Sequence, residues 1–344
     1  MPPSESSAAG APLGIAVNEV FGIEEKSWFQ RMLGAQSFWV TIAMLIICAV
    51  LSILQPRAFA TPQNLYNITT NFSFIGIMAL GMTAVIITGG IDLSVGSVLG
   101  VVVIAAGLVM HGGYAWPWAV LVGLGTGVLC GLFNGILIAV VGLSPFVVTL
   151  GSLAILRSLA VALSQNKMIY EFGDNNKWFF DYVGGGSYQS IAIQVWILAG
   201  LCIVFGLCLH FTVWGRHLFA VGGNENAARL TGISVVRVKV GAYVLSALLA
   251  ALAGVLLLAW QGSAINAVGT GYELKVIAAT VIGGANLVGG EGGTYGAFIG
   301  AALIEVIRNS LTMAGVDSNY QGIFVGAFII LAVLLERVRG RRRD

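Results

Sequence analysis

The sequence predicts an all-α polytopic membrane protein with about ten transmembrane helices, and three observations lead to this fold class. Of the 344 residues, 58% are apolar and only 9% are charged, whereas soluble domains carry about 25% charged residues. The mean hydropathy is +0.92. The longest uncharged stretch covers the 64 residues between Asp92 and Arg157. Because one transmembrane helix needs about 20 apolar residues, this stretch alone predicts two or three helices.

The composition also excludes other classes of protein. A soluble domain of this size needs a polar surface that 17 basic and 15 acidic residues cannot supply. Disorder requires low hydrophobicity, and a net charge of +2 offers no basic surface for nucleic acid. An outer-membrane β-barrel would alternate polar and apolar residues in short strands, but the apolar runs at 38–54 and 323–335 do not alternate.

The first five predicted spans begin after a polar N-terminal stretch. Pro56 ends the first span and Pro62 precedes the second, because proline breaks a helix. A glycine-rich segment separates the second span from the third. Ser144 and Pro145 open the fifth span in the usual order of N-cap and first helical residue. These five spans lie at 37–55, 66–87, 93–110, 116–140 and 145–164.

The last five predicted spans are separated by polar, basic and glycine-rich segments. A polar segment at 165–190 precedes them, and a basic segment at 214–240 separates the sixth span from the seventh. A second glycine-rich segment joins the eighth span to the ninth. These five spans lie at 191–213, 241–260, 273–290, 294–313 and 320–336.

The distribution of Lys and Arg among the loops predicts the orientation. With ten helices both termini lie on one side, and that side carries 11 basic residues against four on the opposite side. The more basic side is cytoplasmic. We therefore expect a flexible cytoplasmic tail at 1–35, a ten-helix transmembrane domain at 36–337 and a basic cytoplasmic tail at 338–344.

Two loops are long enough to carry structure. The external loop 165–190 contains charged and aromatic residues, and it either covers a pathway mouth, receives a partner or is a solvated loop with interfacial aromatics. Within the internal segment 214–240, residues 224–230 favour a short amphipathic helix that Asn224 caps and Gly232 ends. A short helix of this kind suits docking into a groove on another protein.

Glycine-rich segments at 88–96 and 283–293 interrupt the predicted spans. Both contain the pattern Gly-Gly-x-(Asp/Asn)-Leu, which is compatible with an internal repeat and equally with chance. Backbone that leaves a helix at membrane depth is tolerated only where protein or water satisfies its polar groups. Gly89, Gly90, Gly283 and Gly284 therefore predict helix breaks along a pathway, and the alternative is close helix packing through small residues.

Polar side chains within the spans are the remaining site candidates, because charge at membrane depth is costly. Asp92, together with Ser94, either caps the following helix, which we favour, or lines a polar path. Glu305 and Arg308 lie three residues apart and can form a structural pair on one helix face, while Arg157 either snorkels or pairs. Three uncharged candidates for a polar pathway are Asn71, Asn134 and Asn286.

No pattern for bond-making chemistry is present, so we expect no catalytic residue and no metal site. The sequence contains no Walker A motif and no Gly-x-Ser-x-Gly elbow. The three His residues are scattered, and the four Cys residues lie singly in apolar runs.

Several separate segments resemble the permease subunits of ribose-type ABC sugar importers, and they follow in the expected order. The resemblance covers about residues 37–340. The segments are ALGMT at 79–83, ITGGIDLSVGS at 87–97, GLFNG at 131–135, PFVVTLG at 145–151, AVGGNE at 220–225 and IGGAN at 282–286.

The resemblance implies a ten-helix permease of the inner membrane that pairs with a second copy or a close relative. It also implies a periplasmic sugar-binding protein and cytoplasmic ATP-binding subunits, which use ATP and Mg²⁺, while this chain binds no cofactor. A cytoplasmic loop helix in such importers couples ATP hydrolysis to helix movement. In this sequence that segment corresponds to Gly223, Asn224, Glu225, Ala227, Ala228, Arg229 and Gly232.

The coupling segment departs from the wider family's Glu-Ala-Ala pattern, because Asn226 follows Glu225. We expect alternating access, with a monosaccharide delivered by the binding protein. A secondary transporter or channel is the competing class, and it would need a relay of intramembrane carboxylates for which only Asp92 and Glu305 are candidates. A third class is a membrane scaffold without transport activity. The particular sugar is not encoded in these patterns.

Overall fold

The computed structural model describes residues 33–317, 320–324, 326–327 and 330. The predicted tails at 1–35 and 338–344 lie almost wholly outside the described residues, as does most of the predicted span 320–336. The described helices α3 to α13 and both strands lie in a compact unit that begins at Gln36.

The prediction of an all-helical membrane protein is confirmed for the described residues. Seven helices are long and apolar enough to cross a membrane, and a shorter apolar helix, α5, has 17 residues. The seven are α3 (Gln36–Leu54), α4 (Pro62–Ile87), α6 (Trp116–Ala139), α7 (Pro145–Leu163), α8 (Ile193–Phe211), α11 (Val235–Gln261) and α13 (Thr294–Met313).

The eighth predicted span, 273–290, is wrong in its length. Helix α12 (Tyr272–Ile282) has 11 residues, which corresponds to about 16 Å at 1.5 Å per residue and is too short for a hydrocarbon core of about 30 Å. The helix ends where Gly283 and Gly284 follow, and Gly284 adopts φ +103°. Hydropathy counts these glycines as compatible with a span, but their backbone leaves the helix.

The internal segment 214–240 is more helical than predicted. It contains α9 (Val213–Gly223) and α10 (Glu225–Leu230), and α11 begins at Val235, six residues before the predicted start of the seventh span. The extra residues of α11 include Arg237 and Lys239, whose charges lower the local hydropathy without breaking the helix. The predicted short helix after Asn224 is confirmed, because α10 begins at Glu225.

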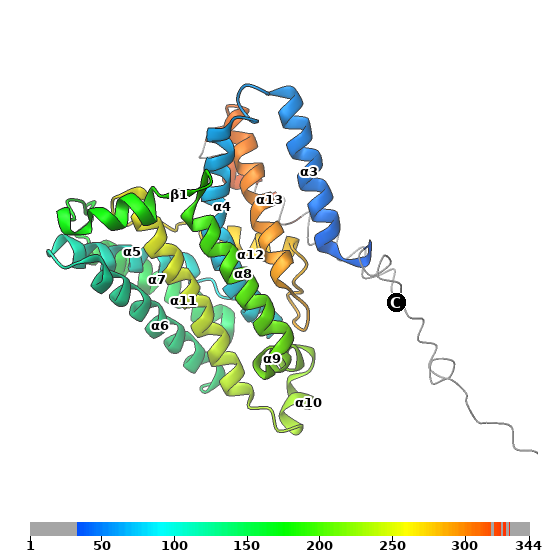
Figure 1. Ribbon diagram of the computed structural model, residues 1–344. Helices are drawn as coiled ribbons and strands as arrows, with labels where there is room; N and C mark the ends of the chain where they lie inside the picture. The colour runs from blue at the N-terminus through cyan, green and yellow to red at the C-terminus, as the bar shows by residue number, and fades with distance from the viewer. Residues whose placement is uncertain (1–32, 318–319, 325, 328–329, 331–344) are drawn as a thin grey trace, which may run out of the picture. The chain divides into compact units, whose positions relative to one another are not determined.

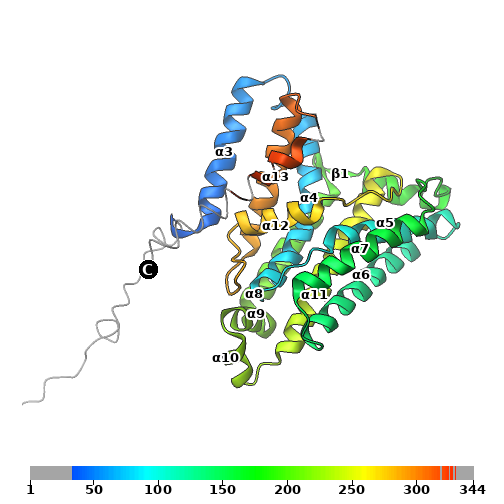
Figure 2. The same cartoon turned by 180° about the vertical axis from the view of Figure 1, so that it is seen from behind.

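Helices α4 and α11 form the interior of the unit, and α5 (Val95–His111) packs against α11, α6 and α7. The apolar stretch of α4 is 94% buried and that of α11 is 78% buried, whereas α3 buries only Val40. Figures 1 and 2 show α3 beside α13, and α5 and α6 packed against α11, with α7 against α5 and α6. Since the outer helices remain apolar where they are exposed, their surfaces suit lipid or another membrane subunit.

The predicted external loop, residues 165–190, is folded against α11, α8 and the start of α6. It contains η1 (Asp174–Asn176), η2 (Phe179–Gly184) and a hairpin of β1 (Ser187–Tyr188) and β2 (Ile191–Ala192). Trp116 stacks on both Trp178 and Phe179. The hairpin lies at one end of the bundle and α9 with α10 at the other (Figures 1 and 2).

Candidate functional site

Two glycine-rich segments interrupt the helices of the bundle. The first break, residues 88–94, joins α4 to α5, and the second break, residues 283–293, joins α12 to α13. Gly89 adopts φ +76° in the first break, and Gly289 adopts φ +106° in the second. A glycine reaches this left-handed region without the steric cost that a side chain would impose.

Asp92 holds the first break to the helices around it. Its carboxylate Oδ1 accepts hydrogen bonds from the Ser94 backbone N–H at 2.9 Å and from the Ser94 hydroxyl at 2.6 Å. Its Oδ2 accepts from the Ser246 hydroxyl of α11 at 2.9 Å. Asp92, Ser94 and Ser246 are fully buried, so these bonds replace the water that the carboxylate has lost.

The same network reaches α6 and α7. The Asn134 amide of α6 donates to the Ser94 hydroxyl oxygen at 2.9 Å, and the Ser152 hydroxyl of α7 donates to Asn134 Oδ1 at 2.5 Å. Asn134 and Ser152 are also buried. The polar cluster therefore ties one break to three helices, and a side chain that breaks one bond would leave its partner unsatisfied.

The second break is organised by hydrogen bonds within its own loop. Asn286 Oδ1 accepts from the Val288 N–H at 3.0 Å, and the Gly289 N–H donates to the Asn286 carbonyl oxygen at 2.9 Å. Val288 is 84% exposed. From outside the loop, the Gln36 amide donates to the Val281 and Ile282 carbonyl oxygens at the end of α12.

The end of α9 contacts the second break and the end of α4 at a point that we name the glycine junction, made by Gly222, Gly290 and the Ile87 carbonyl group. The Gly290 N–H donates to the Ile87 carbonyl oxygen at 2.9 Å and so joins the second break to the end of α4. A methyl group added to Gly222 would collide with that oxygen and lie 2.5 Å from the Gly290 nitrogen. Only glycine at 222 permits this approach of three backbone segments.

Helices α9 and α10, the internal helix pair, contain the predicted coupling residues, except that Asn224 joins the two helices and Gly232 follows α10. Thr212 caps α9 by accepting from the Gly215 N–H at 3.1 Å, and Asn224 caps α10 by accepting from the Ala227 N–H at 2.9 Å. Ala228 is buried, whereas Leu230 is 89% exposed. Gly223, Asn224, Ala227, Arg229 and Gly232 are exposed as well.

Glu225 anchors α10 to the start of α11. Its carboxylate lies 2.6 Å from the Lys239 ammonium group and 3.0 Å from the Arg229 guanidinium group. The hydrogen bond from Lys239 is the main reason that the pKa of Glu225 lies below its usual value of 4.5, and the charges of Lys239 and Arg229 lower the pKa further. Glu225 is therefore ionised at neutral pH and holds both cations.

The other predicted polar residues lie apart from the glycine junction. Arg308 Nε donates to Glu305 Oε2 at 2.8 Å on α13, where Glu305 is buried. Arg157 donates to the Val268 carbonyl oxygen at 2.9 Å. Asn71 donates to the Asn67 carbonyl oxygen one turn earlier in α4, at 2.8 Å, and lies outside the Asp92 network.

Comparison with known proteins places this architecture in a family. Residues 64–333 match the family described as "Branched-chain amino acid transport system / permease component". The chain belongs to this permease family. It is a multi-pass membrane permease component of a bacterial ABC transport system, and its function is transport.

Three relatives of the permease show how far the similarity extends. The ribose import permease protein RbsC of Escherichia coli K12 is 38% identical over 86% of this chain and 92% of its own length. The L-arabinose ABC transporter permease protein AraH of Azospirillum brasilense is 33% identical over 88% of each chain. The autoinducer 2 import system permease protein LsrD of Salmonella paratyphi A is 33% identical over 87% of this chain and 91% of its own length. No solved structure matches the chain.

Several residues of the site were missed by the sequence interpretation of the permease. Ser246 is the only Ser or Thr in the predicted span 241–260, and this isolation was a usable signal for a buried polar contact. Gly222 had no such signal among 47 glycines. Within the described part of the chain, no group of three or more His, Cys, Asp or Glu residues is placed to hold a metal ion.

Proposed function

We propose that the permease is the transmembrane subunit of an ATP-driven importer that moves a monosaccharide from periplasm to cytoplasm by alternating access. The relatives named for ribose, L-arabinose and autoinducer 2 import support a small polyhydroxylated substrate. The observation that carries the mechanism is the glycine junction, where the backbone of α9 contacts the second break and the last residue of α4, directly before the first break.

The internal helix pair is the proposed docking site for a cytoplasmic ATP-binding subunit, which uses ATP and Mg²⁺. Leu230 is a large apolar side chain with 89% of its surface exposed, at the end of a charged six-residue helix. An apolar side chain of this kind is typical of an interface anchor that a partner's pocket buries. The exposed residues around it are Gly223, Asn224, Ala227, Arg229 and Gly232.

Movement of the internal helix pair would pass to the two breaks in different ways. The first break is fastened to α6, α7 and α11 through Asp92, Ser94 and Asn134. The second break has four glycines in left-handed conformations, at 284, 289, 290 and 292. When the ATP-binding subunits close, the glycine junction would transmit the movement to both breaks. The first break is held in place and the second can deform, so α12 and α13 would move relative to α4 and α11.

A second permease copy and a periplasmic sugar-binding protein complete the proposed assembly. We propose a homodimer in the inner membrane, with both termini and the tails at 1–35 and 338–344 in the cytoplasm. Because the binding protein would select the sugar, the pathway needs no high-affinity sugar-binding site with charged side chains. The residues proposed to line it or to form its helix breaks are Asn71, Gly89, Gly90, Asp92, Ser94, Asn134, Gly283, Gly284 and Asn286.

The test is uptake of radiolabelled ribose, arabinose and galactose by proteoliposomes that contain the permease with its ATP-binding subunit and sugar-binding protein. We expect uptake of one of these sugars that requires ATP and is unaffected by ionophores. Uptake that ionophores abolish would favour a secondary transporter, and ATPase activity that no sugar stimulates would favour a scaffold. Either result would overturn the proposal.

Docking is tested separately by Leu230→Asp. We expect the variant to lose co-purification with the ATP-binding subunit, because a charge replaces the apolar anchor. Val213→Asp is the matched control, since Val213 is also exposed but begins α9, away from the tip of α10. Equal co-purification of both variants and the unmodified protein would contradict docking through α10.

A further inference from the structure

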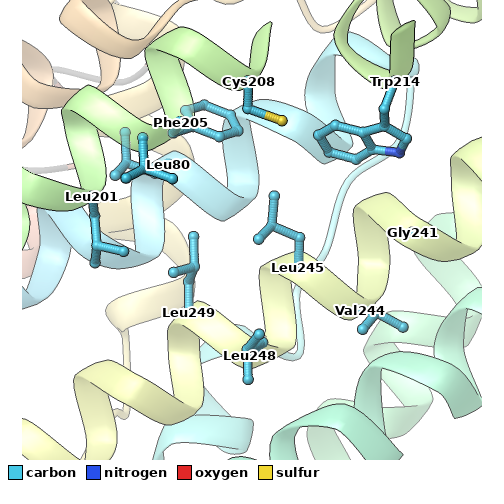
Figure 3. A pocket seen from close by; sticks show the side chains of 11 residues that line it. Leu80, Leu201, Phe205, Cys208, Trp214, Gly241, Val244, Leu245, Leu248 and Leu249 are labelled. Atoms are coloured by element: carbon cyan, nitrogen blue, oxygen red, sulfur yellow. The ribbon is translucent and has the colours of Figure 1, made fainter. Parts of the chain in front are cut away.

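An apolar groove of about 340 Å³ lies between α4, α8, α9 and α11. Figure 3 shows leucine side chains from three of these helices converging on it, with Cys208 and Trp214 at one end. Leu80, Phe205 and Leu249 form a buried floor, whereas Val204 on its rim is 64% exposed. The groove therefore opens from the interior of the helix bundle to an exposed apolar surface.

The dimensions of the groove fit a hydrocarbon chain within one leaflet. Along α11 it extends from Gly241 to Leu249, which is about 12 Å at 1.5 Å per residue. Half of the hydrocarbon core measures about 15 Å. Since close contacts would be lost if an apolar groove stayed empty, a flexible acyl chain is a suitable occupant.

Polar groups stand at the end of the groove nearest the internal helix pair. The Trp214 indole lies against Gly241, because a methyl group added to that glycine would be 3.2 Å from the indole nitrogen. No acceptor for the indole N–H is present among the described residues. Arg237 lies one helical turn before Gly241 and thus on the same face of α11, and its side chain is exposed.

The charges on α8, α9, α10 and α11 are almost all positive. Between positions 191 and 250 the sequence contains one acidic residue, Glu225, which is already bound to Lys239 and Arg229. The guanidinium groups of Arg216 and Arg237 have no ion pair or side-chain hydrogen bond within the part of the chain that the structure describes. Arg237 and the Trp214 indole at one end of an apolar groove, with Arg216 two residues further along α9, complement an anionic headgroup joined to an acyl chain.

We propose that this groove binds an anionic phospholipid of the cytoplasmic leaflet. One acyl chain lies over Leu80, Phe205 and Leu249, the Trp214 indole donates to an ester or phosphate oxygen, and Arg216 and Arg237 hold the phosphate group. The proposal uses the orientation with α9 and α10 in the cytoplasm and is independent of the transported sugar. Because the lipid contacts α4, α8, α9 and α11 together, it would fasten the internal helix pair to the interior of the bundle.

The first test is native mass spectrometry of the purified, detergent-solubilised permease, titrated with phosphatidylglycerol and with phosphatidylcholine of equal chain length. We expect phosphatidylglycerol to be preferred, and Arg216→Gln with Arg237→Gln to remove the preference. The expected loss is about fivefold in affinity for each arginine and roughly 30-fold for the pair. Arg229→Gln is the control, because Arg229 is a neighbouring cation that Glu225 already binds.

The second test locates the acyl chain with phosphatidylglycerol that carries a diazirine on one chain. Photolabelling followed by peptide mapping is expected to mark α8 at 201–208 and α11 at 241–249. Leu245→Trp fills the groove and should lower this labelling, whereas Ile203→Trp, on the exposed face of α8, should not. Equal affinity for both lipids, labelling confined to other helices, or crosslinks from these segments to a second copy of the chain would each overturn the proposal.

Discussion

The first and second breaks share a sequence pattern but are held in different ways. In both, the side chain of the Asp or Asn in the Gly-Gly-x-(Asp/Asn)-Leu pattern accepts a hydrogen bond from the backbone N–H two positions later. Asp92 accepts from Ser94 at 2.9 Å, and Asn286 accepts from Val288 at 3.0 Å. The helix before each break also ends alike, since the Gly90 N–H donates to the Val85 carbonyl oxygen and the Ala285 N–H to that of Thr280.

Their surroundings differ. Asp92 is fully buried and also binds Ser246 of α11, whereas the side chain of Asn286 bonds within its own loop. Two residues separate Asp92 from Val95 at the start of α5, whereas seven residues separate Asn286 from Thr294 at the start of α13. Those additional residues include Gly290, which reaches back to Ile87 and closes the glycine junction.

The comparison indicates that one local turn can serve as a fixed point or as a flexible connection. A buried carboxylate with three donors makes the first break a fixed point. Left-handed glycines and an exposed Val288 make the second break deformable. The comparison is testable at the matched positions Asp92 and Asn286, at the junction where the breaks meet, and in the helix pair that joins them.

The largest expected effect is on stability, from Asp92→Leu. Three donors would lose their acceptor, and each orphaned buried donor costs about 1–3 kcal/mol, so we expect a loss of at least about 3 kcal/mol. Asn286→Leu is the matched variant in the second break and orphans the Val288 N–H. Because water can reach that loop, we expect a loss of at most about 1 kcal/mol.

Melting of the two variants in the same detergent measures this difference. Asp92→Asn is a further control, since an amide oxygen can still accept the two hydrogen bonds from Ser94, and it should melt between Asp92→Leu and the unmodified protein. Similar melting temperatures for Asp92→Leu and Asn286→Leu would contradict the distinction between a fixed and a deformable break.

The next effect is on coupling, from Gly222→Ala. Alanine normally stabilises a helix relative to glycine by about 0.5–1 kcal/mol, but here its methyl group collides with the Ile87 carbonyl oxygen. Overpacking of this kind costs about 1–3 kcal/mol, and the breaks must separate to relieve it. We expect ATP hydrolysis to continue in reconstituted vesicles while sugar uptake falls at least about tenfold.

Gly223→Ala is the control for this variant, because no atom lies within 4 Å of a methyl group added to Gly223. Its uptake should equal that of the unmodified protein. If Gly222→Ala and Gly223→Ala transport equally well, the junction does not carry the movement between the internal helix pair and the breaks.

The sequence predicts most of this architecture because membrane helices have a strong signature in hydropathy and proline placement. Helix α4 begins at Pro62 and α7 at Pro145, as proline at a first helical position predicts. The short length of α12 was not predictable from hydropathy, since glycine is neutral on such scales, and only the glycine pattern at 283–284 predicted a helix break at this place.

The candidate site was predictable in its parts but not in its assembly. Asp92 and Asn134 were singled out as isolated polar residues in apolar sequence, and the structure brings them together through Ser94. The meeting of Gly222 with Ile87 and Gly290 depends on contacts between residues far apart in the chain. No local pattern encodes such a contact, and without a side chain glycine has no chemical preference to reveal it.

The third prediction tests whether the helix pair must keep its exit turn. Gly232 follows α10 with φ +86°, a conformation that costs other residues about 1–2 kcal/mol. We expect Gly232→Trp to reorient α10 and uncouple uptake from ATP hydrolysis, measured in the same vesicles. Gly223→Trp adds the same exposed ring without a left-handed φ, so a larger effect at 223 than at 232 would refute this explanation.

The smallest effect is the pH dependence of the Glu225 anchor. Because its pKa is lowered in the folded protein, mainly by the hydrogen bond from Lys239, its stabilisation is complete above the usual value of 4.5. It is lost as the pH falls through the lower, folded pKa. For a carboxylate this exposed we expect the Glu225 anchor to contribute only about 0.2–1 kcal/mol to stability. This contribution is seen as a difference in melting between the unmodified protein and Glu225→Gln at pH 7 that disappears well below pH 4.5.

The same variant tests the comparison of the two breaks by hydrogen exchange at pH 7. Glu225→Gln should show faster exchange in α10 and in residues 283–293, while residues 88–94 stay unchanged because Asp92 holds them independently. Equal acceleration in both breaks would show that the internal helix pair restrains them alike.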